Sequence, residues 1–299
     1  MKDDYLWDRS GVPDPEVERL ERVLAPLRYR HREPRPNRAR WAVAAAVIGV
    51  AAALVLMVAP SAERTSWQVA GARLRKGQVV RTGSAAVTLE AESVGRVDLA
   101  PHSVLKASSE KKLSLRSGEL HAFIWAPARE FVVDTPSAQA VDLGCEYTLN
   151  VNPQGDGLLR VKLGWVAFQV GDREAFIPAG ALCVTRKKSG PGLPYYEDAP
   201  ADVRNGVAAI ERGETGALGG LLAAARPRDG LTLWHLLTRV PEQDRGAVFE
   251  RYRELVKLPA EVTREGVMRR DGRMIDLCWN ALELENTGWW RGWERKWSE

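Results

Sequence analysis

The sequence predicts a multidomain, membrane-anchored α+β protein with a short cytoplasmic helix, one transmembrane helix, an all-β domain and an α-helical C-terminal module. Three observations predict this fold class. Residues 41–59 carry no charge, residues 77–183 alternate apolar and polar side chains between turn residues, and residues 201–299 change to helical spacing. A chain of 299 residues is long enough to bury more than one core.

The first element is a helix within a head formed by residues 1–40. Asp14, Pro15 and Glu16 form a helix-start signal, because proline and acidic side chains suit the first turn. An apolar stripe follows at helical spacing, and its members are Val17, Leu20, Val23, Leu24 and Leu27. A lone helix of this length is marginal in water, so the stripe needs a cover. Either a partner protein covers it, or the segment folds back on itself or lies on a membrane surface.

Residues 41–59 are predicted to form a transmembrane helix. An uncharged helix of this length spans about 28 Å, close to the hydrocarbon thickness of a bilayer. The alternatives are a buried, alanine-rich core helix and a cleaved signal peptide, although the basic segment before this run is too long for the latter. Six arginines lie between Arg28 and Arg40, and basic flanks stay on the cytoplasmic side. We therefore expect a cytoplasmic N-terminus and an external C-terminal part.

Residues 77–183 are predicted to form a sandwich or β-roll. Apolar and polar residues alternate over 87–92 and 113–116, and turn signals such as Ser117–Gly118, Gly144 and Gly164 recur about every ten residues. Residues 184–200 hold three prolines and two glycines and are interpreted as a linker. Residues 201–299 predict four to six short helices, of which 241–256 is the clearest.

No catalytic, cofactor-binding or metal-binding site is predicted, and the chain is not expected to be an enzyme. The four histidines lie far apart in the sequence, and there is no nucleophile elbow or phosphate-binding loop. Asp98, Asp134 and Asp142 are candidates for an acid–base pair, but carboxylates beside strands are common. The basic run abuts the predicted membrane segment, so direct nucleic-acid binding is not expected.

Three cysteines and a cluster of tryptophans leave alternatives open. Cys145, Cys183 and Cys278 permit one disulfide in an oxidising compartment, but small buried hydrophobic side chains are the favoured interpretation. The C-terminal tryptophans either pack against their own domain or contact a bilayer interface, a sugar or a partner. These four residues are Trp289, Trp290, Trp293 and Trp297.

The β region resembles the FecR-like domain of bacterial transmembrane regulators over about residues 77–183. The motifs that carry the resemblance are Val80-Arg-Thr-Gly83, Ser103-Val-Leu105, Leu113-Ser-Leu-Arg-Ser-Gly-Glu-Leu120, Phe131-Val-Val-Asp-Thr-Pro136, Leu143-Gly-Cys-Glu-Tyr147, Val161 to Val166 and Ile177-Pro-Ala-Gly180. Two positions depart from the family pattern, which usually has threonine in place of Cys145 and an acidic residue in place of Leu163. Both replacements suit a buried or half-buried strand.

The resemblance implies a single-pass protein of the bacterial inner membrane, with a cytoplasmic head that holds a sigma factor and a periplasmic β domain that senses a signal. The implied sigma-factor contacts are Val17, Leu20, Leu24 and Leu27, without zinc. The lipid bilayer is the second expected partner. The alternative function is a membrane-tethered periplasmic module that binds an envelope polymer or another envelope protein.

Overall fold

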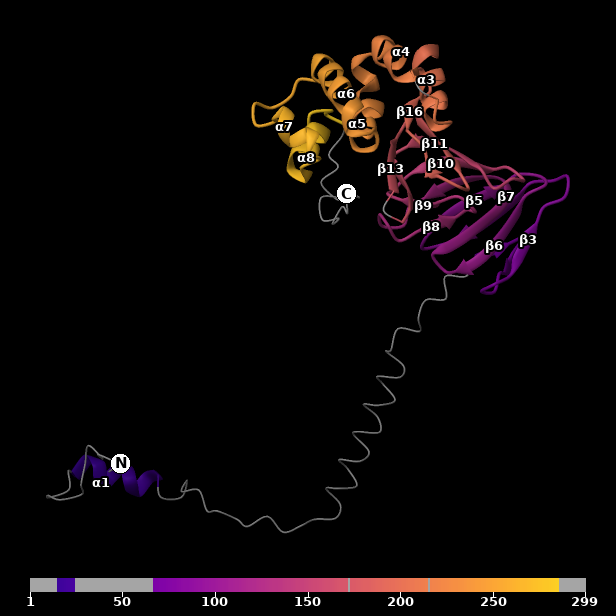
Figure 1. The fold of residues 1–299 in the computed structure, drawn as a ribbon. Helices are drawn as coiled ribbons and strands as arrows, with labels where there is room; N and C mark the ends of the chain where they lie inside the picture. The colour runs from indigo at the N-terminus through magenta and orange to yellow at the C-terminus, as the bar shows by residue number, and fades with distance from the viewer. Residues whose placement is uncertain (1–14, 25–66, 172, 215, 285–299) are drawn as a thin grey trace. The chain divides into compact units, whose positions relative to one another are not determined.

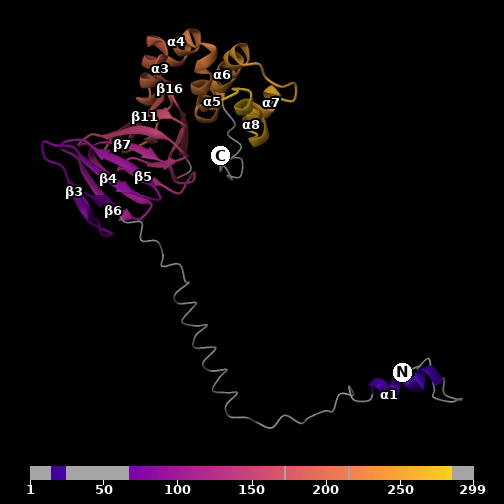
Figure 2. The same cartoon turned by 180° about the vertical axis from the view of Figure 1, so that it is seen from behind.

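The computed structural model describes residues 15–24, 67–171, 173–214 and 216–284. The chain divides into two compact units, Met1–Glu63 and Arg64–Glu299. Helix α1 (Pro15–Leu24) belongs to the first unit. The strands and the remaining helices belong to the second, which combines a β domain with a group of helices at one end of its sheets (Figure 1, Figure 2).

Two sheets share strand β7 (Lys112–Ile124), and they are named sheet A and sheet B here. In sheet A the strands follow the order β2 (Ala72–Arg73), β1 (Gln68–Val69), β4 (Val87–Ala91), β5 (Gly95–Leu99), β7, β10 (Glu146–Val151), β11 (Gly157–Leu163) and β14 (Ala181–Arg186), with β15 (Gly190–Pro191) and β16 (Tyr195–Tyr196) both paired to β14. In sheet B the order is β3 (Val79–Arg81), β6 (Val104–Ser109), β7, β8 (Val132–Asp134), β9 (Gln139–Asp142), β12 (Trp165–Val170) and β13 (Arg173–Pro178). Every pair is antiparallel except β7 with β8, which is parallel.

Strand β7 passes from sheet B to sheet A at Gly118, where the sequence predicts a turn. Its buried side chains change phase there, from Leu113 and Leu115 to Leu120 and Ala122, so the strand bends without reversing. Gly118 has φ +96°, and a Cβ at this position would lie 2.1 Å from the Oγ of Ser103. Only glycine fits both the conformation and the space.

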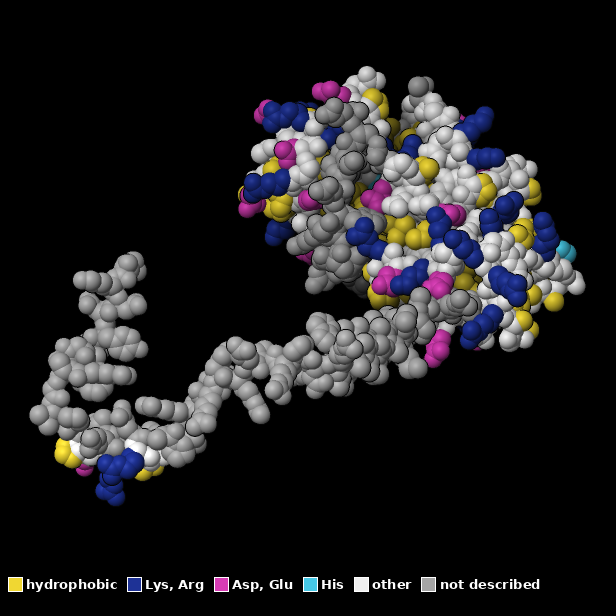
Figure 3. Space-filling view, turned by 90° about the horizontal axis from the view of Figure 1, so that it is seen from below, with side chains coloured by type: hydrophobic (Ala, Val, Ile, Leu, Met, Phe, Trp, Pro, Cys, Tyr) yellow, Lys and Arg dark blue, Asp and Glu magenta, His cyan; other side chains and the backbone are white. Residues whose placement is uncertain are grey.

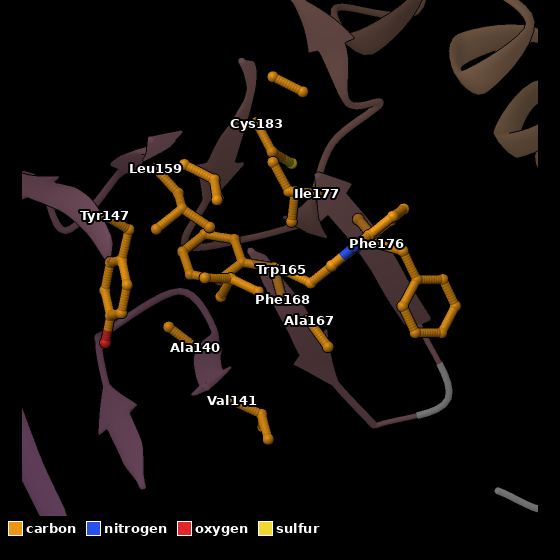
Figure 4. Packing of buried hydrophobic residues seen from close by; sticks show 14 of the residues in the cluster. Ala140, Val141, Tyr147, Leu159, Trp165, Ala167, Phe168, Phe176, Ile177 and Cys183 are labelled. Atoms are coloured by element: carbon orange, nitrogen blue, oxygen red, sulfur yellow. The ribbon is translucent and has the colours of Figure 1, made fainter. Parts of the chain in front are cut away.

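The alternation of apolar and polar residues in the sequence corresponds to the alternation of buried and more exposed side chains in the β domain. In β10 every second side chain is buried, and in β6 Leu105 and Ala107 are buried between half-buried neighbours, as expected for strands with one face toward a core. The inward side chains of the two sheets belong to one continuous apolar cluster. Figure 4 shows part of it, with Tyr147, Leu159, Phe168 and Ile177 contributed by four different strands.

The C-terminal helices are α3 (Ala201–Glu211), α4 (Ala217–Ala224), α5 (Gly230–Arg239), α6 (Glu242–Leu255), α7 (Arg264–Met268) and α8 (Gly272–Asn280). Helix α5 is buried on all sides over residues 230–237. Its Trp234 packs against Phe176 of β13 and Trp279 of α8, with ring centroids 6.4 Å and 4.6 Å apart. The helices therefore share a core with sheet B.

Polar contacts also join α5 to the β domain. The backbone N–H of Phe176 donates to Nε2 of His235 at 3.1 Å. The guanidinium of Arg239 donates to the carbonyl oxygens of Gly192 and Glu174, both at 2.6 Å. Burial, followed by the nearby charge of Arg173, lowers the pKa of Arg239 to about 10. Arg239 nevertheless remains charged at neutral pH, so each of these carbonyl acceptors has a strong donor.

The predicted fold class is wrong in its membrane-spanning element. Within the described part of the chain, no helix is long and apolar enough to cross a membrane. The segment 41–59, on which that prediction rested, lies outside the described residues. Length and apolar composition are necessary for a spanning helix, but they do not by themselves establish one. The all-β domain and the C-terminal helices of the predicted fold class are present.

Charges of both signs lie on the surface of the second unit, and dark-blue and magenta side chains are interspersed on the face seen in Figure 3. Lys112 pairs with Asp134 at 2.8 Å, and Lys111 pairs with Glu130. Both pairs are partly exposed, and such pairs contribute little to stability because solvent screens them.

Candidate functional site

The predicted partner-binding residues lie on α1. The helix begins at Pro15, as the start signal predicts, and it includes Val17, Leu20 and Leu24, which its spacing places along one face. Leu27 lies outside the described residues. The side chain of Val23, at the border of this stripe, is 66% exposed. Helix α1 is thus an amphipathic helix with an apolar stripe along one face.

Two of the three candidate acid–base carboxylates have ordinary surface partners. Asp98 on β5 accepts hydrogen bonds from Thr88 at 2.6 Å and from Arg96 at 3.0 Å. Burial acts to raise the pKa of Asp98, but these hydrogen bonds hold it below its usual value. Asp134 on β8 pairs with Lys112 and accepts a hydrogen bond from Gln139. None of these contacts brings a second carboxylate next to Asp98 or Asp134.

The third carboxylate, Asp142, is fully buried at the end of β9. Its Oδ1 accepts from the backbone N–H of Gly144 at 2.8 Å, and its Oδ2 accepts from the thiol of Cys145. Burial raises the pKa of Asp142 to about 7, although both hydrogen bonds act to lower it. At neutral pH this buried carboxyl group is therefore divided between its protonated and ionised forms.

Cys145 and Tyr147 complete this buried cluster. Burial, followed by the charge of Asp142, raises the pKa of the Cys145 thiol well above its usual value, so it is a poor nucleophile at neutral pH. The buried hydroxyl of Tyr147 has no hydrogen-bond partner among the described residues. All three side chains are less than 4% exposed, so a substrate cannot reach them without a change in the fold.

All three cysteines are free and buried. Across the parts of the chain that the structure describes, no three His, Cys, Asp or Glu side chains are grouped so as to hold a metal ion.

Sequence reasoning missed an exposed group on the outer face of sheet A. Phe123, Trp125 and Leu163 lie on or beside β7 and β11, and their side chains are 46%, 51% and 58% exposed. In the sequence Phe123 is followed by Ile124 and Trp125, and a run of large apolar residues usually indicates buried positions. The strand register indicates that Phe123 faces solvent, because Phe123 lies opposite two charged residues, Arg96 and Glu146.

No protein-family model and no curated protein matches the sequence. Two solved structures are similar to part of the chain, and both are described as a "putative anti-sigma factor" from Parabacteroides distasonis. They are 15% and 16% identical to the chain, with TM-scores of 0.35 and 0.34. Each match covers 46% of this chain and 65% of the other, so this chain spans less than two thirds of the length of the proteins it matches.

Proposed function

We propose that the protein is a regulator that binds a sigma factor through the apolar stripe of α1, formed by Val17, Leu20 and Leu24, together with Leu27. The compact unit of sheets and helices is then the part that responds to a signal and changes the availability of the stripe. The observation that carries the proposal is α1 itself, an amphipathic helix in a unit separate from the β domain.

The energetics of α1 support a binding role. A ten-residue helix is too short to be stable alone in water, because helix nucleation is costly and few hydrogen bonds follow it. Covering its apolar face with a partner supplies the missing free energy. Helix-in-groove recognition uses this arrangement, with anchors spaced three and four residues apart. Leu20 and Leu24 have that spacing.

The resemblance of the β domain's sequence to FecR-like domains supports a sigma factor as the partner. Two motif glycines occupy positions that only glycine suits: Gly144 has φ +88° and Gly164 has φ +70°. A Cβ on Gly164 would lie 2.0 Å from the carbonyl oxygen of Gly144, so the two motifs are in direct contact. The local backbone therefore depends on Gly144 and Gly164, which belong to the motifs that carry the resemblance.

Replacing both Leu20 and Leu24 by aspartate is expected to weaken sigma-factor binding strongly. Two carboxylates in an apolar interface would have to be desolvated without a partner, so we expect at least about a tenfold loss of affinity. The measurement is affinity capture with the full-length chain from a lysate of the source organism, followed by mass spectrometry.

The matched control replaces Arg19 and Arg22, which are exposed on the opposite side of α1, by asparagine. This variant is expected to recover as much sigma factor as the unaltered chain. Absence of any sigma factor from the unaltered capture, or equal recovery by both double variants, contradicts the proposal.

A further inference from the structure

Three arginines from different elements converge on the short strand β15 in the described part of the second unit. Arg173 begins β13, Arg186 ends β14 and Arg239 ends α5. The Nε–H of Arg173 donates to the carbonyl oxygen of Pro191 at 2.8 Å, and the Nη1 of Arg239 donates to the same oxygen at 3.2 Å. Two guanidinium groups therefore meet at one uncharged acceptor. We call these three residues the arginine cluster.

Arg186 contributes a buried donor to the cluster. It lies opposite Gly190 of β15, and its Nε is buried without a hydrogen-bond partner among the described residues. Its Nη1 lies 3.7 Å from the carboxylate of Asp156. A buried N–H group lowers stability unless an acceptor reaches it, so this donor favours a ligand that brings an acceptor.

The carboxylate of Glu211, on α3, lies near all three guanidinium groups, but its hydrogen-bond donor is a backbone group. It accepts from the backbone N–H of Leu193 at 2.5 Å. Burial raises the pKa of Glu211, whereas this hydrogen bond and the charges of the three arginines act to lower it. The arginines therefore act on Glu211 through their charge and keep N–H groups for another acceptor.

The balance of charge around the cluster is positive. Its three guanidinium groups are accompanied by two carboxylates, those of Glu211 and Asp156. Lys187 and Lys188, in the turn before β15, are both exposed. Together these described side chains carry five positive and two negative charges. Like charges held close together repel one another, so an anion that enters the cluster relieves the repulsion.

The cluster can be reached from solvent through Arg173. This residue is exposed, whereas Arg186, Arg239 and Glu211 are half-buried. The guanidinium of Arg239 is already fixed by carbonyl oxygens of β13 and of the residue after β15. A ligand therefore meets one guanidinium that is oriented in advance and a second one that closes on it from the surface.

We propose that the arginine cluster binds a phosphate group. The oxygens of a phosphate point in tetrahedral directions and can accept from all three arginines at once, whereas a carboxylate offers two oxygens in one plane. Guanidinium groups bind phosphate through paired, charge-assisted N–H···O bonds. The phosphate belongs either to a soluble phosphorylated molecule or to the headgroup of a phospholipid. This inference is independent of the sigma-factor proposal, because it concerns a different unit of the chain.

The test titrates the full-length chain with inorganic phosphate at constant ionic strength, with chloride as the reference anion, and obtains the affinity from the rise in unfolding temperature. Arg173→Gln removes one exposed guanidinium and is expected to weaken the affinity about tenfold. The matched control is Arg81→Gln, a change at an exposed arginine of β3. This control is expected to bind phosphate as the unaltered chain does.

Glu211→Gln is expected to have the opposite effect. Glutamine keeps an oxygen that can accept from the N–H of Leu193, but it removes a negative charge beside the arginines. The affinity for phosphate is therefore expected to rise about threefold or more. Opposite effects of the two variants distinguish binding at the cluster from a general stabilisation of the protein by phosphate.

Phosphatidylcholine vesicles with and without phosphatidic acid distinguish the two sources of the phosphate. The basic run from Arg28 to Arg40 is expected to attract anionic vesicles as well. The informative part of the binding is therefore the part that Arg173→Gln loses and Arg81→Gln keeps. Such binding assigns the site to a lipid headgroup, and phosphate affinity without it assigns the site to a soluble phosphorylated ligand.

The unfolding temperature of each variant without phosphate establishes that the variant is folded. The inference is overturned if phosphate raises the unfolding temperature no more than chloride does, or if it does so equally in the unaltered chain and in Arg173→Gln. An unchanged or lower affinity in Glu211→Gln also overturns it, because the phosphate then binds away from the cluster.

Discussion

Replacing Trp234 by alanine is expected to lower the free energy of unfolding by about 3–5 kcal/mol, the range for deleting a large aromatic side chain from a core. Trp234 is 1% exposed and stands at the centre of the contact between the helices and sheet B. Its ring centroid lies 4.6 Å from that of Trp279 and 4.9 Å from that of His235. Alanine would leave a cavity among these rings.

The substitution also removes a hydrogen bond. The indole Nε1–H of Trp234 donates to the carbonyl oxygen of Ile275 at 2.9 Å, and alanine leaves this buried acceptor without that donor. Urea unfolding of the purified chain measures the loss. Trp125→Ala serves as the comparison: its side chain is half exposed, so the free energy of unfolding is expected to fall by much less than in Trp234→Ala. If Trp234→Ala unfolds within about 1 kcal/mol of the unaltered chain, the helices do not share the core described above.

Asp142 is expected to make the protein less stable as pH rises. Its carboxyl pKa is about 7 in the folded chain, whereas its ordinary value is 3.8. Between these two values the folded state binds the proton more tightly than the unfolded state does, so folding stability falls as pH increases from about 4 to about 7. Below this window both states are protonated, and above it both are ionised, so stability no longer depends on this group. The full difference is on the order of 4 kcal/mol.

Asp142→Asn removes the titrating group and is expected to flatten this pH dependence. Urea unfolding at intervals between pH 5 and pH 8 measures the slope for both proteins. Asp134→Asn is the control, because it keeps Asp142 and is therefore expected to retain the slope of the unaltered chain. Equal slopes for Asp142→Asn and the unaltered chain would show that Asp142 is not titrating in a buried site.

The β domain was predictable because half-buried strands impose an alternation that the sequence displays directly. The path of β7 could not be predicted, because glycine at position 118 suits a strand that bends as well as a chain that reverses direction in a turn. The decision between them depends on Ser103, which lies fifteen positions away in the sequence and fills the space beside the glycine. Local turn chemistry contains no information about that neighbour.

The bounds of helix α5 could not be predicted from the sequence for a related reason. A helix on the surface shows a period of 3.6 residues, but α5 is buried on all sides, and its Leu231, Leu233, Leu236 and Leu237 leave no polar face to reveal the period. The start of α1 was predictable, because Pro15 and its acidic neighbours act within one turn. The carboxylate–thiol contact of Asp142 and Cys145 required the loop geometry around Gly144, which the spacing of the residues does not specify.

The most direct test of the proposed sigma-factor contact is site-specific photocrosslinking in living cells, with a photoreactive amino acid placed at position 20 or position 19 of the full-length chain. Leu20 lies on the apolar stripe of α1, and Arg19 is exposed on the opposite side. The account predicts a crosslinked adduct with a sigma factor from position 20 and none from position 19. No adduct from position 20, or equal adducts from both positions, would contradict it.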